Sequence, residues 1–173
     1  SIHIGGIIVA EEKDLLFDQE EDTQKGKYLT FNLGKEVFGI EIKYVTEIIG
    51  LQPISEVPEV PDFVKGIINL RGKIIPLIDV RLKFKKEPVE YNDRTCIIVI
   101  DIDNTSVGLI VDQVAEVLSI EDDMIVPPPD YRTGFQNKYI KSIGRVGEEV
   151  KLILDCDKLL NDDELDLVEQ VTL

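Results

Sequence analysis

After residue 27 the order of apolar and polar residues is mostly typical of β-strands, and "KYLTFNLG" alternates between them with a period of two. The strand-like segments are rich in β-branched and aromatic residues: "KYLTFNLG", "EVFGIEI", "TCIIVIDID", "TSVGLIVDQVAEVLSI", "YIKSIGRV" and "EVKLILD". Between two of them, Asp103 and Asn104 form a typical hairpin turn signal. The pattern therefore predicts a mainly β fold of short antiparallel strands.

The two ends of the chain depart from this pattern. Residues 1–26 are rich in acids and hold one short apolar island, so we expect a flexible acidic N-terminal tail. Residues 27–173 are expected to form the domain. At its end, Asn161 precedes three acidic residues, which is typical of a helix N-terminus and predicts a helix over about 161–170.

The chain also contains an internal repeat, with approximate copies at 28–90 and 94–160. Residues 38–49 align with 107–118, and residues 63–79 align with 139–155 after seven extra residues in a proline-rich loop. One such unit is too small to bury its own apolar face well. The repeat therefore predicts two small antiparallel barrels that share a core.

The repeat helps to separate structural residues from functional ones. Asp79 and Asp155 occupy equivalent positions before short helix-like pieces, so both are expected to be helix N-caps. Arg71, by contrast, aligns with Gly147, so the equivalent turn does not need an arginine and a role outside the fold becomes credible. Glu47 is expected either to be structural or to be the ion partner of Arg71.

Composition and charge restrict the function. The 173 residues have a formal net charge of −15, which argues against a nucleic-acid backbone or an anionic membrane as the partner. The basic run at 81–86 is interpreted as a solvated surface, with a contact for an acidic protein as the alternative. Cys96 and Cys156 lie far apart within apolar segments and are expected to be buried free thiols, with a disulfide as the alternative that spacing alone leaves open.

The sequence offers little for catalysis. Its one histidine, His3, lies in the expected tail, so His-based metal sites and nucleophile–base pairs lack a credible histidine. We find no glycine-rich phosphate loop of either common spacing. These observations predict a β-rich binding module with no catalytic residues, no metal and no cofactor.

The signature "INLRGKIIPLIDVRLKF" resembles the central motif of the CheW family of bacterial chemotaxis adaptors. The flanking segments "FGIEIKYVTEI", "VPDFVKG", "VGLIVDQVAEVL" and "PPPDY" are similar to that family in the same order, over about residues 27–165. The resemblance implies two SH3-like five-stranded antiparallel barrels and a non-catalytic adaptor. Such an adaptor is cytoplasmic and couples the cytoplasmic tips of methyl-accepting chemoreceptors to the regulatory domain of the histidine kinase CheA at receptor arrays.

The resemblance also implies roles for individual residues. Receptor binding would fall to Val45, Glu47, Asn69 and Arg71, near the groove between the barrels, and kinase binding to Val126 and Tyr131. We expect a monomer that joins larger signalling assemblies and neither inserts into membranes nor binds nucleic acid. The alternative is a CheW-like domain cut from a CheA kinase or a CheV-type protein.

Overall fold

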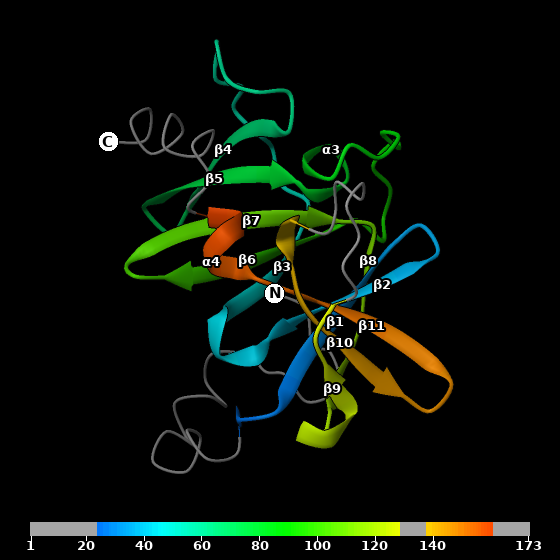
Figure 1. Ribbon diagram of the computed structural model, residues 1–173. Helices are drawn as coiled ribbons and strands as arrows, with labels where there is room; N and C mark the ends of the chain where they lie inside the picture. The colour runs from blue at the N-terminus through cyan, green and yellow to red at the C-terminus, as the bar shows by residue number, and fades with distance from the viewer. Residues whose placement is uncertain (1–23, 129–137, 161–173) are drawn as a thin grey trace.

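The computed structural model describes residues 24–128 and 138–160 (Figure 1). The expected tail up to residue 23, Tyr131 and the expected helix at 161–170 lie outside these residues. Within the described part, no helix has the length and apolar character needed to cross a membrane.

The described chain forms two β-sheets, which confirms the predicted mainly β fold of two SH3-like barrels. The five-stranded sheet has the order β3-β6-β7-β5-β4, with β3 Val45–Gly50, β4 Val64–Leu70, β5 Lys73–Asp79, β6 Cys96–Ile102 and β7 Thr105–Val111. The other sheet has the order β8-β1-β2-β11-β10-β9. Its strands are β1 Lys27–Leu33, β2 Glu36–Glu41, β8 Gln113–Ser119, β9 Ile125–Val126, β10 Ile140–Val146 and β11 Glu149–Leu154.

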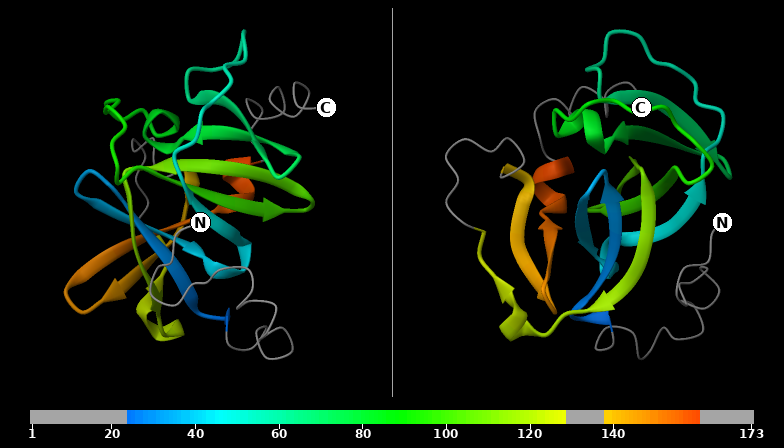
Figure 2. Two further views of the ribbon diagram at one scale, coloured as in Figure 1. Left: turned by 180° about the vertical axis from the view of Figure 1, so that it is seen from behind. Right: turned by 90° about the vertical axis from the view of Figure 1, so that its right-hand side faces the viewer.

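Each sheet draws strands from both sequence copies, an exchange that the repeat alone does not predict. The first hairpin, β1–β2, pairs with β8 and β11 of the second copy, and the equivalent hairpin β6–β7 pairs with β3 and β5 of the first. Figures 1 and 2 show the β1–β2 hairpin lying beside the C-terminal strands. The pairs β2–β11 and β5–β7 are parallel and the other described pairs are antiparallel. Both parallel pairs join a strand of one copy to a strand of the other, so the two copies are interlocked.

The core has two parts. A large cluster includes Phe31, Phe38, Phe84 and Tyr139 and takes residues from both sheets, as expected for copies that share a core. A smaller cluster fills the inside of the five-stranded barrel, and its buried members are Ile49, Ile68, Ile75, Leu77, Ile97, Val99 and Ile110. Successive side chains of a strand point to opposite faces, so every second residue of these strands faces the inside of the barrel and belongs to what we call its inner row. Beyond the buried cluster, the inner row continues to one end of the barrel.

The predicted turn and cap residues are confirmed. Asp79 accepts a hydrogen bond from the Leu82 backbone N–H at the start of α3 (Val80–Lys83), and Asp155 accepts one from the Lys158 N–H in α4 (Cys156–Leu160). Asp103 and Asn104 both have positive φ, which is the backbone of a two-residue hairpin turn. Cys96 and Cys156 are buried free thiols.

The interpretation of residues 81–86 as a solvated surface is wrong for part of the run. Lys83 is only 2% exposed, and its Nζ lies 4.1 Å from the centre of the Phe63 ring. Lys86 forms an ion pair with Glu36. The run forms α3 and the turn after it, which pack against the core, so its charged groups find partners within the protein.

Candidate functional site

The β4–β5 hairpin ends in a two-residue turn, Arg71-Gly72, whose φ angles are 53° and 87°. Asn69 Oδ1 accepts a hydrogen bond from the Gly72 N–H at 2.8 Å and so supports the turn. A positive φ is unfavourable for arginine because its Cβ crowds the backbone, whereas glycine adopts it freely. The equivalent turn between β10 and β11 has Gly147 at this position, with φ 63°. Arginine at position 71 is therefore not the choice that the turn itself favours.

Glu47 reaches the hairpin because strand β3 contains a β-bulge. Val45 pairs with Ile100 and Glu47 with Val99, so Thr46 is an extra residue in β3. In a regular strand Val45 and Glu47 would share a face, but a bulge moves them to opposite faces. Glu47 consequently lies on the face of Val99 and Ile49, which is the inside of the five-stranded barrel.

Arg71 Nη2 donates a hydrogen bond to Glu47 Oε1 in an ion pair. Strands β3 and β4 are the two edges of the five-stranded sheet, so this pair links the edges where the barrel closes. The Arg71 side chain is 71% exposed and the Glu47 side chain 14%. The hydrogen bond and charge of Glu47 raise the pKa of Arg71. Glu47 thus orients the Arg71 guanidinium, which remains exposed for contact with a partner protein.

Val45 is not part of this exposed site. Val45 is only 3% exposed and belongs to the core shared by the two barrels. This burial corrects the expectation of direct receptor contact by Val45, because a partner cannot reach a side chain that the core covers. Its place in the site is indirect, since it anchors the strand that carries Glu47.

Of the two residues expected on the kinase side, the described one, Val126, does not adjoin Arg71 in the sheets. Val126 is half-buried in β9 and pairs with Ile143 in the six-stranded sheet, whereas Arg71 belongs to the five-stranded one. Tyr131 lies outside the described residues. The receptor and kinase candidates that are described therefore lie on different barrels.

Polar side chains that the sequence analysis did not single out continue the inner row of the five-stranded barrel. Lys73 Nζ donates to Ser106 Oγ at 2.7 Å, and Ser106 pairs with Asp101 across β6 and β7. We call Glu47, Arg71, Lys73, Asp101 and Ser106 the barrel mouth. The signal for Asp101 is present in "TCIIVIDID", where a carboxylate replaces an apolar residue in the inward-facing register.

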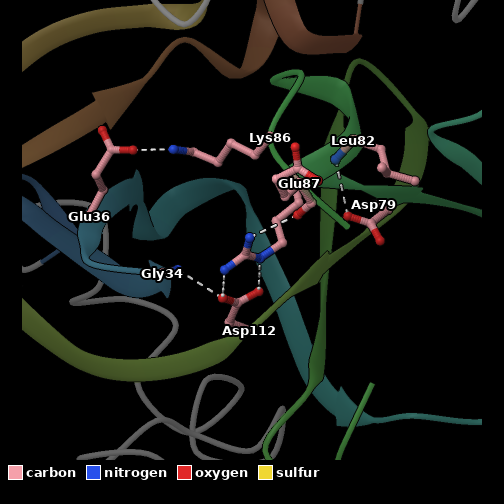
Figure 3. Close-up of polar contacts among 8 residues, drawn as sticks. Gly34, Glu36, Asp79, Leu82, Lys86, Glu87 and Asp112 are labelled. Atoms are coloured by element: carbon pink, nitrogen blue, oxygen red, sulfur yellow. Dashed lines mark hydrogen bonds and ion pairs between the residues drawn. The ribbon is translucent and has the colours of Figure 1, made fainter. Parts of the chain in front are cut away.

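A second polar cluster, the clasp, joins the two barrels (Figure 3). Arg81 donates from Nε and Nη2 to the two carboxylate oxygens of Asp112, each at 2.7 Å, and the Gly34 N–H donates to Asp112 Oδ2 at 2.8 Å. Asp112 lies where the chain leaves β7 for β8, and Gly34 lies in the β1–β2 turn. The clasp thus fixes three segments that meet between the sheets.

The clasp predicts a specific response to acid. Burial alone would raise the pKa of Asp112, but the hydrogen bonds from Arg81 and Gly34 and the charges of Arg81 and Lys86 outweigh it and hold that pKa below its ordinary value. The stabilisation is therefore complete above about pH 4 and is lost as the pH falls further. Asp112→Asn should lower the free energy of unfolding by about 2 kcal/mol at neutral pH, since the pair is charged and mostly buried.

Urea unfolding of the wild type and Asp112→Asn between pH 3 and pH 7 tests this expectation. The difference between the two proteins should be constant above pH 5 and should shrink below pH 4. A difference that stays constant down to pH 3 would contradict the lowered pKa of Asp112.

Comparisons with known proteins agree with this geometry. The model of the CheW-like domain family matches residues 27–164. The chain is 38% identical over 150 residues to the chemotaxis protein CheW of Klebsiella aerogenes, covering 87% of this chain and 90% of that one. It is 33% identical to CheW of Treponema pallidum, covering 79% and 83%. The crystal structure of the scaffolding protein TtCheW from Thermoanaerobacter tengcongensis matches with a TM-score of 0.75 and 34% identity, over 80% of this chain and 94% of that one.

Proposed function

The chain belongs to the CheW family, and from this premise we propose that it is a non-catalytic adaptor that couples methyl-accepting chemoreceptors to the histidine kinase CheA in bacterial chemotaxis. The observation that carries the receptor side is Arg71, a mostly exposed arginine held by Glu47 on a turn that would favour glycine. An unfavourable φ at a long, exposed side chain supports the hypothesis that the side chain has a function.

A receptor's helical hairpin suits this surface. Such a hairpin offers an apolar stripe with acidic or amide groups beside it. Ile74 is exposed and pairs with Asn69 across β4 and β5, one step from the turn, so the hairpin that carries Arg71 also carries an exposed apolar side chain. Apolar burial supplies affinity, and the planar donors of arginine fix the register of the bound helices.

The kinase side of the proposal rests on the other barrel. Val126 and Tyr131 are the proposed contacts for the regulatory domain of CheA. Because Val126 belongs to the six-stranded sheet and the Arg71 turn to the five-stranded one, one adaptor can hold both partners at once. The protein would then act in the cytoplasm, as a monomer recruited to membrane-bound receptor arrays.

The alternative is that the chain is a CheW-like domain of a CheA kinase or a CheV-type protein. The similarity to the Klebsiella aerogenes CheW extends over 90% of that adaptor, which supports the adaptor proposal. The mass of the natural polypeptide in its own cell separates the two, because a kinase or CheV-type protein carries additional domains.

Reconstitution tests the function directly. CheA autophosphorylation is measured with receptor cytoplasmic fragments assembled on vesicles, with and without this chain. We expect receptor-dependent kinase stimulation only when the chain is present, and Tyr131→Ser should lower kinase recruitment without changing receptor binding. Equal kinase stimulation with and without the chain would reject the adaptor role.

A further inference from the structure

We propose that Asp101 is a further residue of the partner-binding surface, where it accepts a hydrogen bond from an N–H-bearing side chain of the docked helical hairpin. This inference rests on the proposed function, because it adds a second polar contact to the surface around Arg71. It assigns opposite polarities to two parts of the barrel mouth: Arg71 offers donors and Asp101 offers an acceptor.

The first observation is that one carboxylate oxygen of Asp101 lacks a hydrogen-bond partner. Its Oδ1 is shielded from solvent and is the buried side-chain oxygen without a hydrogen-bond partner in the part of the chain that the structure describes. A shielded carboxylate oxygen without a donor lowers stability, and such groups in native proteins call for an explanation. Nothing in the fold of these residues requires a carboxylate at position 101.

The second observation is that the neighbouring polar groups are already engaged with one another. Arg71 donates to Glu47 and Lys73 donates to Ser106, so two cations and two other acceptors of the mouth form their own pairs. The set of five side chains is formally neutral, yet none of its donors reaches Asp101 Oδ1. A donor supplied by a partner completes it.

The third observation concerns position. Asp101 pairs with Ser106 across β6 and β7. It lies on the same face of β6 as Val99, because side chains two residues apart in a strand share a face. Glu47 lies on this face too, towards the same end of the barrel. The residue as a whole is only half-buried. Rotation of the carboxylate about its Cβ–Cγ bond can therefore bring either oxygen to the surface.

The repeat supplies a matched comparison. The equivalent of Asp101 in the first copy is Asn32 in β1, which is also half-buried but carries no charge. The barrel of Asn32 has Gly147 where the other barrel has Arg71. The carboxylate and the arginine therefore occur together, on the same barrel.

The test compares Asp101→Val, Asp101→Asn and the control Asn32→Val with the wild type. Affinity is measured for a soluble cytoplasmic receptor fragment that binds the wild-type chain, and thermal unfolding is measured on the same preparations. Valine suits a strand and its inner-row neighbours, so Asp101→Val should unfold at the same temperature as the wild type or higher. Its affinity for the receptor fragment should fall tenfold or more, because a charged hydrogen bond is lost and the partner's donor is left unpaired.

Asp101→Asn preserves the shape and identifies the donor. A loss similar to that of valine indicates a cationic donor on the receptor, and near wild-type affinity indicates a neutral amide. Asn32→Val should bind normally. Wild-type affinity in Asp101→Val would overturn the inference and assign the carboxylate to solvent, and so would a fall of several degrees in its melting temperature, which would make Asp101 a fold residue. Failure of the wild type to bind any receptor fragment would instead reject the proposed function.

Discussion

Arg71→Glu is expected to weaken binding to a chemoreceptor fragment by about thirtyfold or more while leaving the melting temperature within a few degrees of the wild type. The side chain is mostly exposed, and its turn is formed by glycine in the other barrel, so the fold does not depend on the arginine. Charge reversal both removes the donors and places a second carboxylate beside Glu47, which repels the acidic groups of a partner.

Arg71→Gly is the matched control for this prediction. It installs the residue that the equivalent turn already uses, and it relieves the unfavourable positive φ. Its affinity for the receptor fragment should fall although its thermal stability is kept. Unchanged affinity in both variants would remove Arg71 from the receptor site, whereas unfolding of both would show that the turn needs its ion pair.

The ion pair itself introduces one complication, which a charge swap resolves. If Arg71 acts mainly by fixing Glu47, then the double variant Glu47→Arg, Arg71→Glu should regain receptor binding, because the pair is re-formed with reversed polarity. If Arg71 contacts the receptor directly, then the swapped pair should bind as weakly as Arg71→Glu. We expect the second result, since the guanidinium is far more exposed than the carboxylate.

Gly66→Ala is expected to lower the free energy of unfolding by about 2–4 kcal/mol, since it combines backbone strain with the loss of hydrogen bonds. The chain after β3 closes the five-stranded barrel at Ser55, which exchanges two backbone hydrogen bonds with Ile67, at 3.0 and 2.9 Å. A Cβ at position 66 would lie 2.2 Å from the Ser55 carbonyl oxygen, and Gly66 also has a φ of 144°. The methyl group must therefore push the closing segment away.

For a protein of this size the loss corresponds to a fall of roughly 5–15 °C in the melting temperature. Gly147→Ala is the appropriate comparison, because Gly147 also has a positive φ but no atom lies within 4 Å of its added Cβ. It should cost about 1 kcal/mol or less. Equal losses in the two variants would show that backbone strain alone, and not closure of the barrel, sets the effect at Gly66.

Much of the secondary structure could be predicted from sequence because each half-buried strand has a period of two. The caps Asp79 and Asp155 were also predictable, since carboxylates at equivalent positions before short helices have one common structural use. The exchange of hairpins was not predictable from the repeat. Hairpins β1–β2 and β6–β7 have the same pattern, so the alternation cannot indicate which of them pairs with β11.

The site was predictable in part for similar reasons. The repeat singled out Arg71, and the pairing with Glu47 was one of two alternatives considered. The burial of Val45 was missed because it depends on the bulge at Thr46, a backbone feature that alternation does not encode. The face of β3 on which Val45 lies becomes clear only when the pairing of β3 with β6, with its bulge, is known.

The exchange of hairpins has a consequence for the order of assembly during synthesis. Phe38 in β2 pairs with Leu152 in β11, so the first hairpin finds its parallel neighbour only among the last described strands. Contacts between such distant segments form slowly, because a long loop must close before they contribute stability. The N-terminal hairpin therefore leaves the ribosome with an unpaired edge and stays incomplete until nearly the whole domain has been translated. Because each sheet takes strands from both halves, we expect that neither half of the chain forms its barrel alone and that two separately expressed halves fold only when they meet.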